Sequence, residues 1–406
     1  FIRSNVISLE GTRTFIPFSS GFAKMPDGWP KSWPDNLDAG VYSAGPYSWL
    51  DPREYYKKAI AGKDWVFKDE TGLPSMQPYN IMPQIVPDLV WDKTLPFPLN
   101  NTWGYHDACS GNGRWGQYYS EMVKRYGEPE TMERFCDKMQ LMNAVGYQGI
   151  FEAAGHKFND IGGVMLWKLN AAFPSVVWQV YDWFLMPNSG YYFMQSACEP
   201  VHIQLNLSNN KVMVLNRTYK QVSGLTAQVN VYSLDSKPTF SENINVSLAP
   251  TDIKETSSLE KVIMEAKGVT FIVLNLKNQS GKVISHNVYW ISPDGDYKSM
   301  NEMAETNINV SVLKEEKGKN DREWNVRITN STEKIAFFIR PQLMSGGKEI
   351  LPSFWSGSYF TLAPGESTEV TVTCPSANLA GADPVLKVSG WNVPVTEKKL
   401  GRGQYF

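Results

Sequence analysis

The sequence is poor in the residue types that build disulfide frameworks or metal sites. It has four cysteines and four histidines among 406 residues. Cys109, Cys136, Cys198 and Cys374 are too few and too scattered for a disulfide scaffold, and the histidines form no zinc signature. We therefore expect free or buried thiols and no metal site.

An excess of one charge and long apolar runs are also lacking. Lys and Arg total 39 against 41 Asp and Glu, so the net charge is −2. Without a basic excess, nucleic acid is not an expected partner. No apolar run reaches the roughly 18 residues that would indicate a membrane span. Aromatic residues, by contrast, make up 13% of the chain with 14 tryptophans. Rings suit sugar-binding clefts, although most aromatic residues in any protein are core residues.

The pattern of the first part, up to about residue 198, indicates alternating strands and helices. Apolar residues at spacings of three and four predict an amphipathic helix: Met132, Phe135, Met139 and Met142. The segment 128–130 is a reasonable start for it. The apolar run 163–167 predicts a buried strand that leads into a functional loop, and 191–198 predicts another helix. This rhythm is typical of a β/α fold.

After Pro200 the alternation becomes that of antiparallel strands. Turn residues recur about every 8–12 positions, as in a sandwich of about 100 residues. The first set of predicted strands covers 201–205, 227–231, 244–248, 271–274 and 283–291. The second set covers 308–313, 324–328, 335–339, 359–362 and 370–373. We predict three domains, at 1–198, 199–300 and 301–406.

Asn-x-Ser/Thr sequences are frequent in the chain. They occur at Asn100, Asn206, Asn216, Asn245, Asn278, Asn309 and Asn330. Such matches arise by chance in Asn-rich β-domains, and they are glycosylation sites only in a secretory eukaryotic host.

Several segments, in chain order, resemble exo-β-D-glucosaminidases and β-mannosidases of glycoside hydrolase family 2. Residues 65–75, with Lys68-Asp69-Glu70-Thr71-Gly72 at their centre, resemble the nucleophile segment of these enzymes. Further resembling segments are 19–21, 24–28, 45–47, 166–175, 191–192, 199–204, 286–290 and 359–366. Each motif alone is weak, but their order spans nearly the whole chain.

The resemblance implies the C-terminal half of a (β/α)₈ TIM barrel followed by two immunoglobulin-like β-sandwiches. A complete barrel needs about 250 residues, and here the first sandwich is predicted to begin at residue 199. Four strand positions, near 15–18, 41–47, 66–70 and 164–169, would be barrel strands five to eight. Because a half-barrel leaves unpaired strand edges, we expect an N-terminal segment or separate chain to complete it.

The resemblance also implies a reaction with two carboxyl groups. Retaining glycosidases place them about 5–5.5 Å apart, at the carboxyl ends of barrel strands. Glu70 resembles the nucleophile. The acid/base of the family follows an Asn or Asp, and the sole Asn-Glu pair here, Asn301-Glu302, falls between the sandwiches. We therefore expect the acid/base upstream of Phe1. This chemistry needs no metal or organic cofactor.

Four further residues are candidate substrate-binding residues, and each has a structural alternative. Tyr47 resembles the tyrosine that hydrogen-bonds the nucleophile and favours its ionised form, or it packs after a turn. Trp167 would form the floor of the sugar subsite, or it is a core residue. Asn170 would bond sugar hydroxyls, or it caps a turn. His106 would line the cleft, or it is a structural histidine.

The function implied by the resemblance is hydrolysis of terminal β-linked sugars, with exo-β-D-glucosaminidase as the leading interpretation. A β-mannosidase or endo-β-mannosidase is the alternative within the family. Outside it, a carbohydrate-binding module set or a structural fragment remains open. The expected partner is a β-linked oligosaccharide or glycan, with no nucleic acid and no membrane. Such substrates indicate a secreted or periplasmic protein, or a lysosome-like compartment in a eukaryote.

Overall fold

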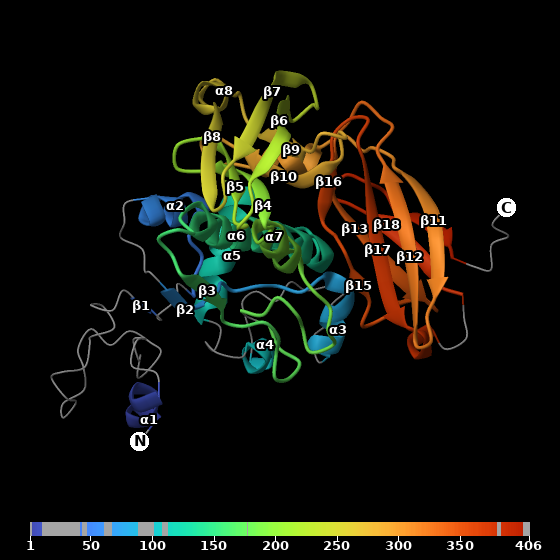
Figure 1. Cartoon of the computed structure of the whole chain (residues 1–406). Coiled ribbons are helices and arrows are strands. Elements are labelled where there is room, and N and C mark those ends of the chain that lie inside the picture. Colours follow the sequence, from blue (N-terminus) through green and yellow to red (C-terminus); the bar gives the residue numbers. More distant parts are fainter. Residues whose placement is uncertain are drawn as a thin grey trace.

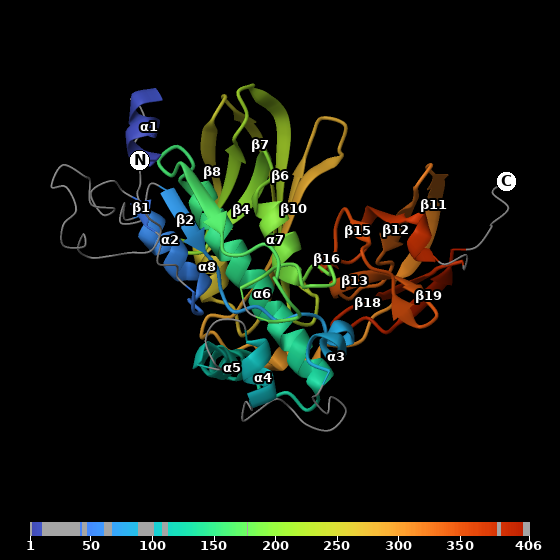
Figure 2. The same cartoon turned by 90° about the horizontal axis from the view of Figure 1, so that it is seen from below.

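The computed structural model describes residues 2–9, 41–42, 47–60, 67–87, 101–107, 113–176, 178–379 and 383–400. The predicted strand at 15–18 lies outside the described residues. Figure 1 shows helices at the centre of the molecule, one set of strands above them in green and yellow, and a second set to the right in orange and red. The view from below shows α6 (Met132–His156) crossing the centre between these parts (Figure 2).

The first part contains a three-stranded parallel sheet. Its order is β1 (Val41–Tyr42), β2 (Phe67–Thr71) and β3 (Gly163–Leu166). The strands predicted at 41–47 and 164–169 are thus confirmed in shorter form, and the strand predicted at 66–70 is confirmed with a shift of one residue. The prediction that β3 is buried is wrong, because Met165 is 54% exposed. Among the described residues β3 is an edge strand of this sheet, and one of its faces is open to solvent.

The long central helix confirms the predicted apolar stripe. All four stripe residues are buried, and the helix is α6. Its first residue is Met132, just after the predicted start at 128–130, because the side chain of Thr131 caps it by accepting the N–H of Arg134 at 3.1 Å. The other predicted helix is α7 (Ser189–Ala197). The helices α7 and α6 pack so closely that a Cβ at Gly190 would be 2.4 Å from the ring of Tyr147.

Shorter helices complete the first part. They are α1 (Ile2–Leu9), α2 (Pro52–Ile60), η1 (Tyr79–Ile81), α3 (Met82–Ile85), α4 (Asn101–His106) and α5 (Gly113–Tyr126). Of the helices in the described ranges, none has both the length and the apolar character that crossing a membrane would require.

The first sandwich is antiparallel, as predicted. One sheet has the order β4-β5-β8 and the other β10-β9-β6-β7. The strands are β4 (Val201–Asn206), β5 (Lys211–Asn216), β6 (Val222–Ser233), β7 (Pro238–Leu248), β8 (Asp252–Ser258), β9 (Thr270–Lys277) and β10 (Val283–Ile291), with α8 (Glu260–Met264) between β8 and β9. Alternate apolar residues of both sheets form one core, which includes Ile203, Val229 and Leu274.

The second sandwich follows the 3-10 helix η2 (Lys298–Glu302). One sheet has the order β11-β12-β17-β15, and the other β14-β13-β18-β19 with β16 on β13. The strands are β11 (Asn309–Lys317), β12 (Asp321–Thr329), β13 (Ala336–Ser345), β14 (Lys348–Glu349), β15 (Phe354–Trp355), β16 (Phe360–Leu362), β17 (Ser367–Pro375), β18 (Val385–Ser389) and β19 (Thr396–Lys399), with η3 (Ser376–Leu379) after β17. The domain boundaries at 199 and 301 stay predictions.

A buried polar cluster joins α6 to the first sandwich. The carboxylate of Glu152, which is 1% exposed, accepts hydrogen bonds from the hydroxyls of Tyr56 at 2.9 Å and Tyr289 at 2.7 Å. It also lies 3.4 Å from Nε2 of His202 and accepts from the amide of Asn287. These bonds connect α2, α6, β4 and β10, so the cluster fixes how the helices sit on the sandwich.

Four of the Asn-x-Ser/Thr sequences have a structural role. In each, Oδ1 of Asn accepts the backbone N–H of the Ser or Thr two residues later at 2.9–3.1 Å and its hydroxyl at 2.7–2.8 Å. These residues are Asn206, Asn216, Asn278 and Asn330. Three of them, Asn206, Asn216 and Asn330, are at most 1% exposed, so their amides are inaccessible to a glycosylating enzyme in the folded chain. These sequences therefore terminate strands as Asx turns.

Candidate active site

Glu70 lies at the carboxyl end of β2, as the sequence predicts. In the parallel register Lys68 pairs with Val164 and Thr71 with Leu166, so Glu70 lies beside the last residues of β3. Its side chain is partly buried, and the structure gives it no hydrogen-bond partner among the residues that it describes. A carboxylate in this position is free to meet a ligand at the edge where the parallel strands end.

Trp167 is held next to this strand end. Its backbone N–H donates to the carbonyl of Thr71 at 2.8 Å, and its side chain is 44% exposed. The backbones approach so closely that a Cβ at Gly72 would lie 2.2 Å from the carbonyl oxygen of Trp167. The glycine after Glu70-Thr71 therefore allows the loop after β3 to cross the end of β2, and this crossing brings Trp167 and Glu70 to one edge.

Tyr47 reaches the same loop through Trp178. The indole Nε1 of Trp178 donates to the carbonyl of Tyr47 at 3.0 Å, and the two rings lie 4.8 Å apart. The carbonyl of Trp178 in turn accepts the N–H of Lys168 at 2.8 Å. Trp178 thus positions this edge, and sequence reasoning missed it. Nothing in its local sequence distinguishes it from a core tryptophan.

Asn170 and His106 make contacts that fit their structural alternatives. Nδ1 of His106 lies 2.7 Å from the carbonyl oxygen of Pro174, and its own carbonyl accepts the N–H of Val176 at 2.9 Å. His106 therefore ties α4 to the loop after β3. Asn170 is exposed, with its amide 3.4 Å from the carbonyl of Ala171. The roles of both residues in sugar binding stay predictions.

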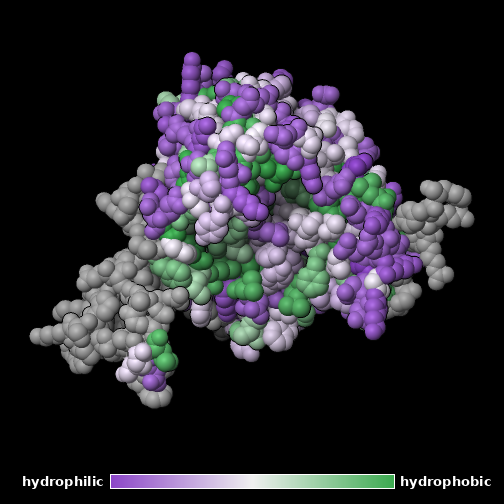
Figure 3. Space-filling model, viewed as in Figure 1, coloured by the Kyte–Doolittle hydropathy of each residue, from purple (hydrophilic) through white to green (hydrophobic). Residues whose placement is uncertain are grey.

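Exposed apolar side chains lie on α4 and on the loop after β3. Tyr105 is 75% exposed, Leu169 53% and Phe173 37%, and the rings of Tyr105 and Phe173 are 6.3 Å apart. Figure 3 shows apolar surface in green over β3 and the loop that follows it. Exposed rings suit a sugar, whose CH face packs on an aromatic side chain. In the described ranges no group of histidine, cysteine and acidic residues has the arrangement of a metal site.

Two family models match the sandwiches. The model of the mannosidase Ig/CBM-like domain matches residues 208–293, and that of the exo-β-D-glucosaminidase Ig-fold domain matches residues 287–393. Both parts that the sequence predicted to be immunoglobulin-like therefore have matching domain models.

Relatives match along most of the chain. The exo-β-D-glucosaminidase of Streptomyces avermitilis is 28% identical over 89% of this chain and 43% of its own length. That of Amycolatopsis orientalis is 26% identical over 87% of this chain and 37% of its own. The mannosylglycoprotein endo-β-mannosidase of Lilium longiflorum is 25% identical over 95% and 46%. The chain thus spans less than half the length of these relatives.

Solved structures share the fold. The exo-chitosanase of Amycolatopsis orientalis superposes with a TM-score of 0.76 at 24% identity, over 87% of this chain and 45% of its own. The β-D-mannosidase of Dictyoglomus thermophilum gives a TM-score of 0.64 at 15% identity, over 85% and 39%. The predicted resemblance is therefore confirmed, and this chain is similar to part of the exo-β-D-glucosaminidases and β-mannosidases, which are glycosidases of the family 2 type.

Proposed function

We propose that this chain supplies the nucleophile, Glu70, of a retaining β-glycosidase whose acid/base lies upstream of Phe1. The observation that carries the proposal is the position of Glu70 at the carboxyl end of β2, beside the exposed Trp167. The proposal is supported by the sequence similarity to exo-β-D-glucosaminidases, which extends over residues on both sides of β2.

In the proposed reaction the carboxylate of Glu70 attacks the anomeric carbon of the sugar. A glycosyl–enzyme ester bond forms while the glycosidic bond breaks, and the leaving oxygen takes a proton from the acid/base. Water, deprotonated by the same acid/base, then attacks the anomeric carbon and releases Glu70. Trp167 packs on the sugar. No hydrogen bond joins Tyr47 to Glu70 in the structure, so we assign Tyr47 only its contact with Trp178 at this edge.

We further propose that β1–β3 are strands of a partial (β/α)₈ barrel that an upstream segment or separate chain completes. The exposed apolar residues Met165, Trp167 and Leu169 support this proposal, because β3 and the following loop present them to solvent at 54%, 44% and 53%. Apolar side chains gathered on one face usually contact another part of a protein or a ligand.

A terminal β-linked glucosamine is the proposed substrate. Exo-β-D-glucosaminidases of two actinobacteria support it. A β-mannoside is the second candidate, favoured by the mannosidase domain match at residues 208–293 and by the lily endo-β-mannosidase. The two are distinguished by comparing kcat/KM for p-nitrophenyl β-D-glucosaminide and p-nitrophenyl β-D-mannoside. Because glycans are met outside the cytoplasm, we propose a secreted, periplasmic or lysosome-like location.

The proposal is tested with Glu70→Gln in the native assembly, purified from its source host. Intact mass spectrometry before and after denaturation identifies any second polypeptide. We expect kcat to fall at least ~10³-fold while the fold is retained, as for loss of other catalytic nucleophiles. The matched control is Glu130→Gln, an exposed carboxylate before α6, which should keep wild-type activity.

Two outcomes would contradict the proposal. Unchanged hydrolysis by Glu70→Gln would exclude the nucleophile role and favour a carbohydrate-binding or structural module. Full activity of a lone 45.8 kDa species would exclude an acid/base upstream of Phe1.

A further inference from the structure

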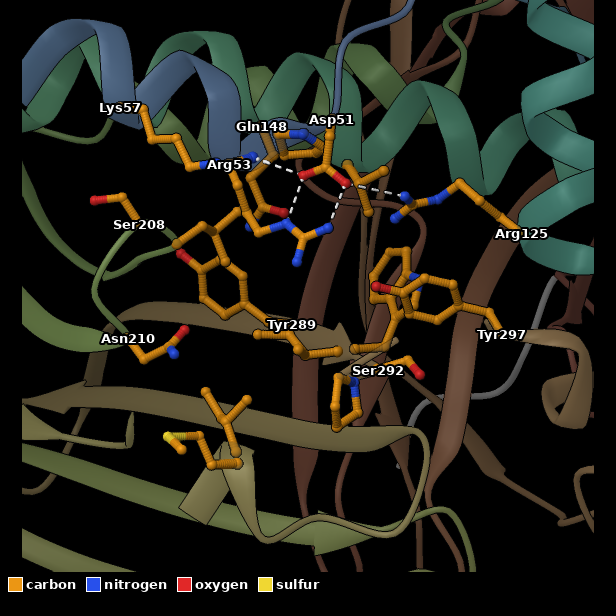
Figure 4. A pocket seen from close by; sticks show the side chains of 18 residues that line it. Asp51, Arg53, Lys57, Arg125, Gln148, Ser208, Asn210, Tyr289, Ser292 and Tyr297 are labelled. Carbon is orange, nitrogen blue, oxygen red and sulfur yellow. Dashed lines mark hydrogen bonds and ion pairs between the residues drawn. The ribbon is translucent and has the colours of Figure 1, made fainter. Parts of the chain in front are cut away.

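A cavity of about 360 Å³ lies between the helices and the first sandwich, and none of the five candidate active-site residues lines it. Its upper wall in Figure 4 comes from α2, the residues before α2, α5 and α6, and its lower wall from the turn between β4 and β5, α8, the end of β10 and the segment that follows. Charged side chains gather on the helical wall and apolar ones on the sandwich wall. The cavity is therefore a separate feature with its own chemistry.

The central group is the guanidinium of Arg125, which points into the cavity from the end of α5 (Figure 4). Arg125 is only 8% exposed. Its Cζ lies 4.8 Å from the ring centroid of Tyr297 and 5.4 Å from that of Trp49, so stacking fixes its position. Its NH1 lies 3.3 Å from Oδ2 of Asp51, and the guanidinium borders the cavity beside that carboxylate.

The charges on the helical wall do not cancel. Asp51 accepts two hydrogen bonds from the guanidinium of Arg53, at 2.8 and 2.9 Å. Burial alone would raise the pKa of Asp51, but the bonds from Arg53 and the charge of Arg125 lower that pKa to about 2. Lys57, which also lines the cavity, is paired with the carboxylate of Glu54 at 2.7 Å. Two carboxylates, Asp51 and Glu54, thus face three cations, and one net positive charge remains on this wall.

The sandwich wall is mostly apolar. It presents Ile263, Tyr289, Trp290 and Pro293 to the cavity, together with the polar Ser208, Asn210 and Ser292. Tyr289 and Trp290 are 3% and 4% exposed, and their polar atoms are engaged elsewhere, with Glu152 and Tyr126. A hydrated inorganic anion would leave this wall uncovered, and a neutral ligand would leave the net positive charge of the helical wall without a partner.

We propose that this cavity binds a small organic carboxylate with a ring-sized apolar body, its carboxylate on Arg125 and Arg53 and its ring against Trp290 and Ile263. Asp51 already occupies the Nε and NH2 groups of Arg53, so the ligand carboxylate meets both guanidinium groups from their remaining sides, as a charged hydrogen-bond acceptor. The proposal is independent of the glycosidase function, because no residue of the candidate active site takes part.

The test is isothermal titration calorimetry of the chain with benzoate at low ionic strength. Uncharged benzamide has the same ring and serves as the ligand control, and inorganic phosphate tests for a general anion site. We expect benzoate to bind, and benzamide and phosphate to bind at least tenfold more weakly. Added salt should weaken benzoate binding, because the cavity is open to solvent.

Variants locate the site. Arg125→Gln should weaken benzoate at least tenfold, as expected for a lost charge-assisted hydrogen bond. Since Arg125 is buried, Arg53→Gln is the second variant: its side chain is 50% exposed, and its loss should weaken benzoate several-fold in a folded chain. Lys261→Gln, 85% exposed and outside the cavity lining, is the matched control. The proposal is overturned if benzoate does not bind, if benzamide or phosphate binds equally well, or if Arg53→Gln leaves binding unchanged.

Discussion

Replacing Glu152 by alanine should destabilise the chain strongly, because Glu152 is the common acceptor of the buried cluster between α6 and the first sandwich. The hydroxyl protons of Tyr56 and Tyr289 both go to its carboxylate. Tyr56 is fully buried and Tyr289 is 3% exposed, and burial, followed by the charge of Glu152, raises their pKa values well above the usual range. They are therefore neutral, and without Glu152 their hydroxyl groups would have no water molecule to accept their hydrogen bonds.

The magnitude follows from the groups left unpaired. Each buried donor without an acceptor costs about 1–3 kcal/mol, so two tyrosine hydroxyls give about 2–6 kcal/mol. The amide of Asn287 keeps its other bonds, to the carbonyl of Ile203 at 3.2 Å and to the hydroxyl of Tyr289 at 2.9 Å, and adds little. We expect Glu152→Ala to lower the free energy of unfolding by about 4 kcal/mol, within the range known for a broken buried pair.

The assay is urea unfolding followed by tryptophan fluorescence and circular dichroism. Glu152→Gln keeps the shape and one acceptor, so its loss should be about 1–2 kcal/mol. Glu305→Ala, an exposed carboxylate between the sandwiches, should stay within ~0.5 kcal/mol of wild type. Comparison requires equal m values. A loss below ~1 kcal/mol for Glu152→Ala would refute the argument that the cluster is an obligatory junction.

Three further perturbations test other features. Burial lowers the pKa of His202, but its hydrogen bonds to two carboxylates outweigh this and raise it above 6.5. Its contribution to stability should therefore be complete below pH 6.5 and be lost as pH rises through the folded-state pKa, and His202→Gln should remove this dependence from urea titrations at several pH values. Gly72→Ala would place a Cβ 2.2 Å from a backbone oxygen and should cost at least ~2 kcal/mol in thermal unfolding, whereas Gly116→Ala, with no atom within 4 Å inside α5, should stabilise by ~0.5–1 kcal/mol. Asn330→Ala removes donors to three carbonyls at 2.7–3.2 Å and should lower the free energy of unfolding, measured in urea, by about 2–4 kcal/mol, while the exposed Asn309→Ala should be nearly neutral in the same assay.

Much of the fold could be predicted because the chain carries clear periodicity. The stripe of α6 and the alternating strands of both sandwiches are local patterns, and in each the apolar residues repeat with the period of a single type of secondary structure. The boundaries were less predictable: α6 begins at Met132 because of the single cap Thr131, and the apolar run at 163–167 gives a strand, β3, that is half open. The run itself does not say what covers each face, since a buried and a half-exposed strand share the same residue types.

The candidate site was predictable only in part. Glu70 and Trp167 were found from motifs, and the structure brings them to one edge. Trp178 was missed, since its contacts with Tyr47 and Lys168 depend on a loop crossing that no local pattern shows.

The sequence by itself determined the order of strands and helices, the two sandwiches, and the resemblance that singles out Glu70, because these depend on residues close together in the chain. The tertiary structure alone decided which charged residues are buried. Glu152 meets Tyr56 and Tyr289 across 96 and 137 residues, and Arg125 meets Asp51 across 74. A charged side chain is stable inside a protein only when distant partners satisfy it, and those partners are brought together by folding.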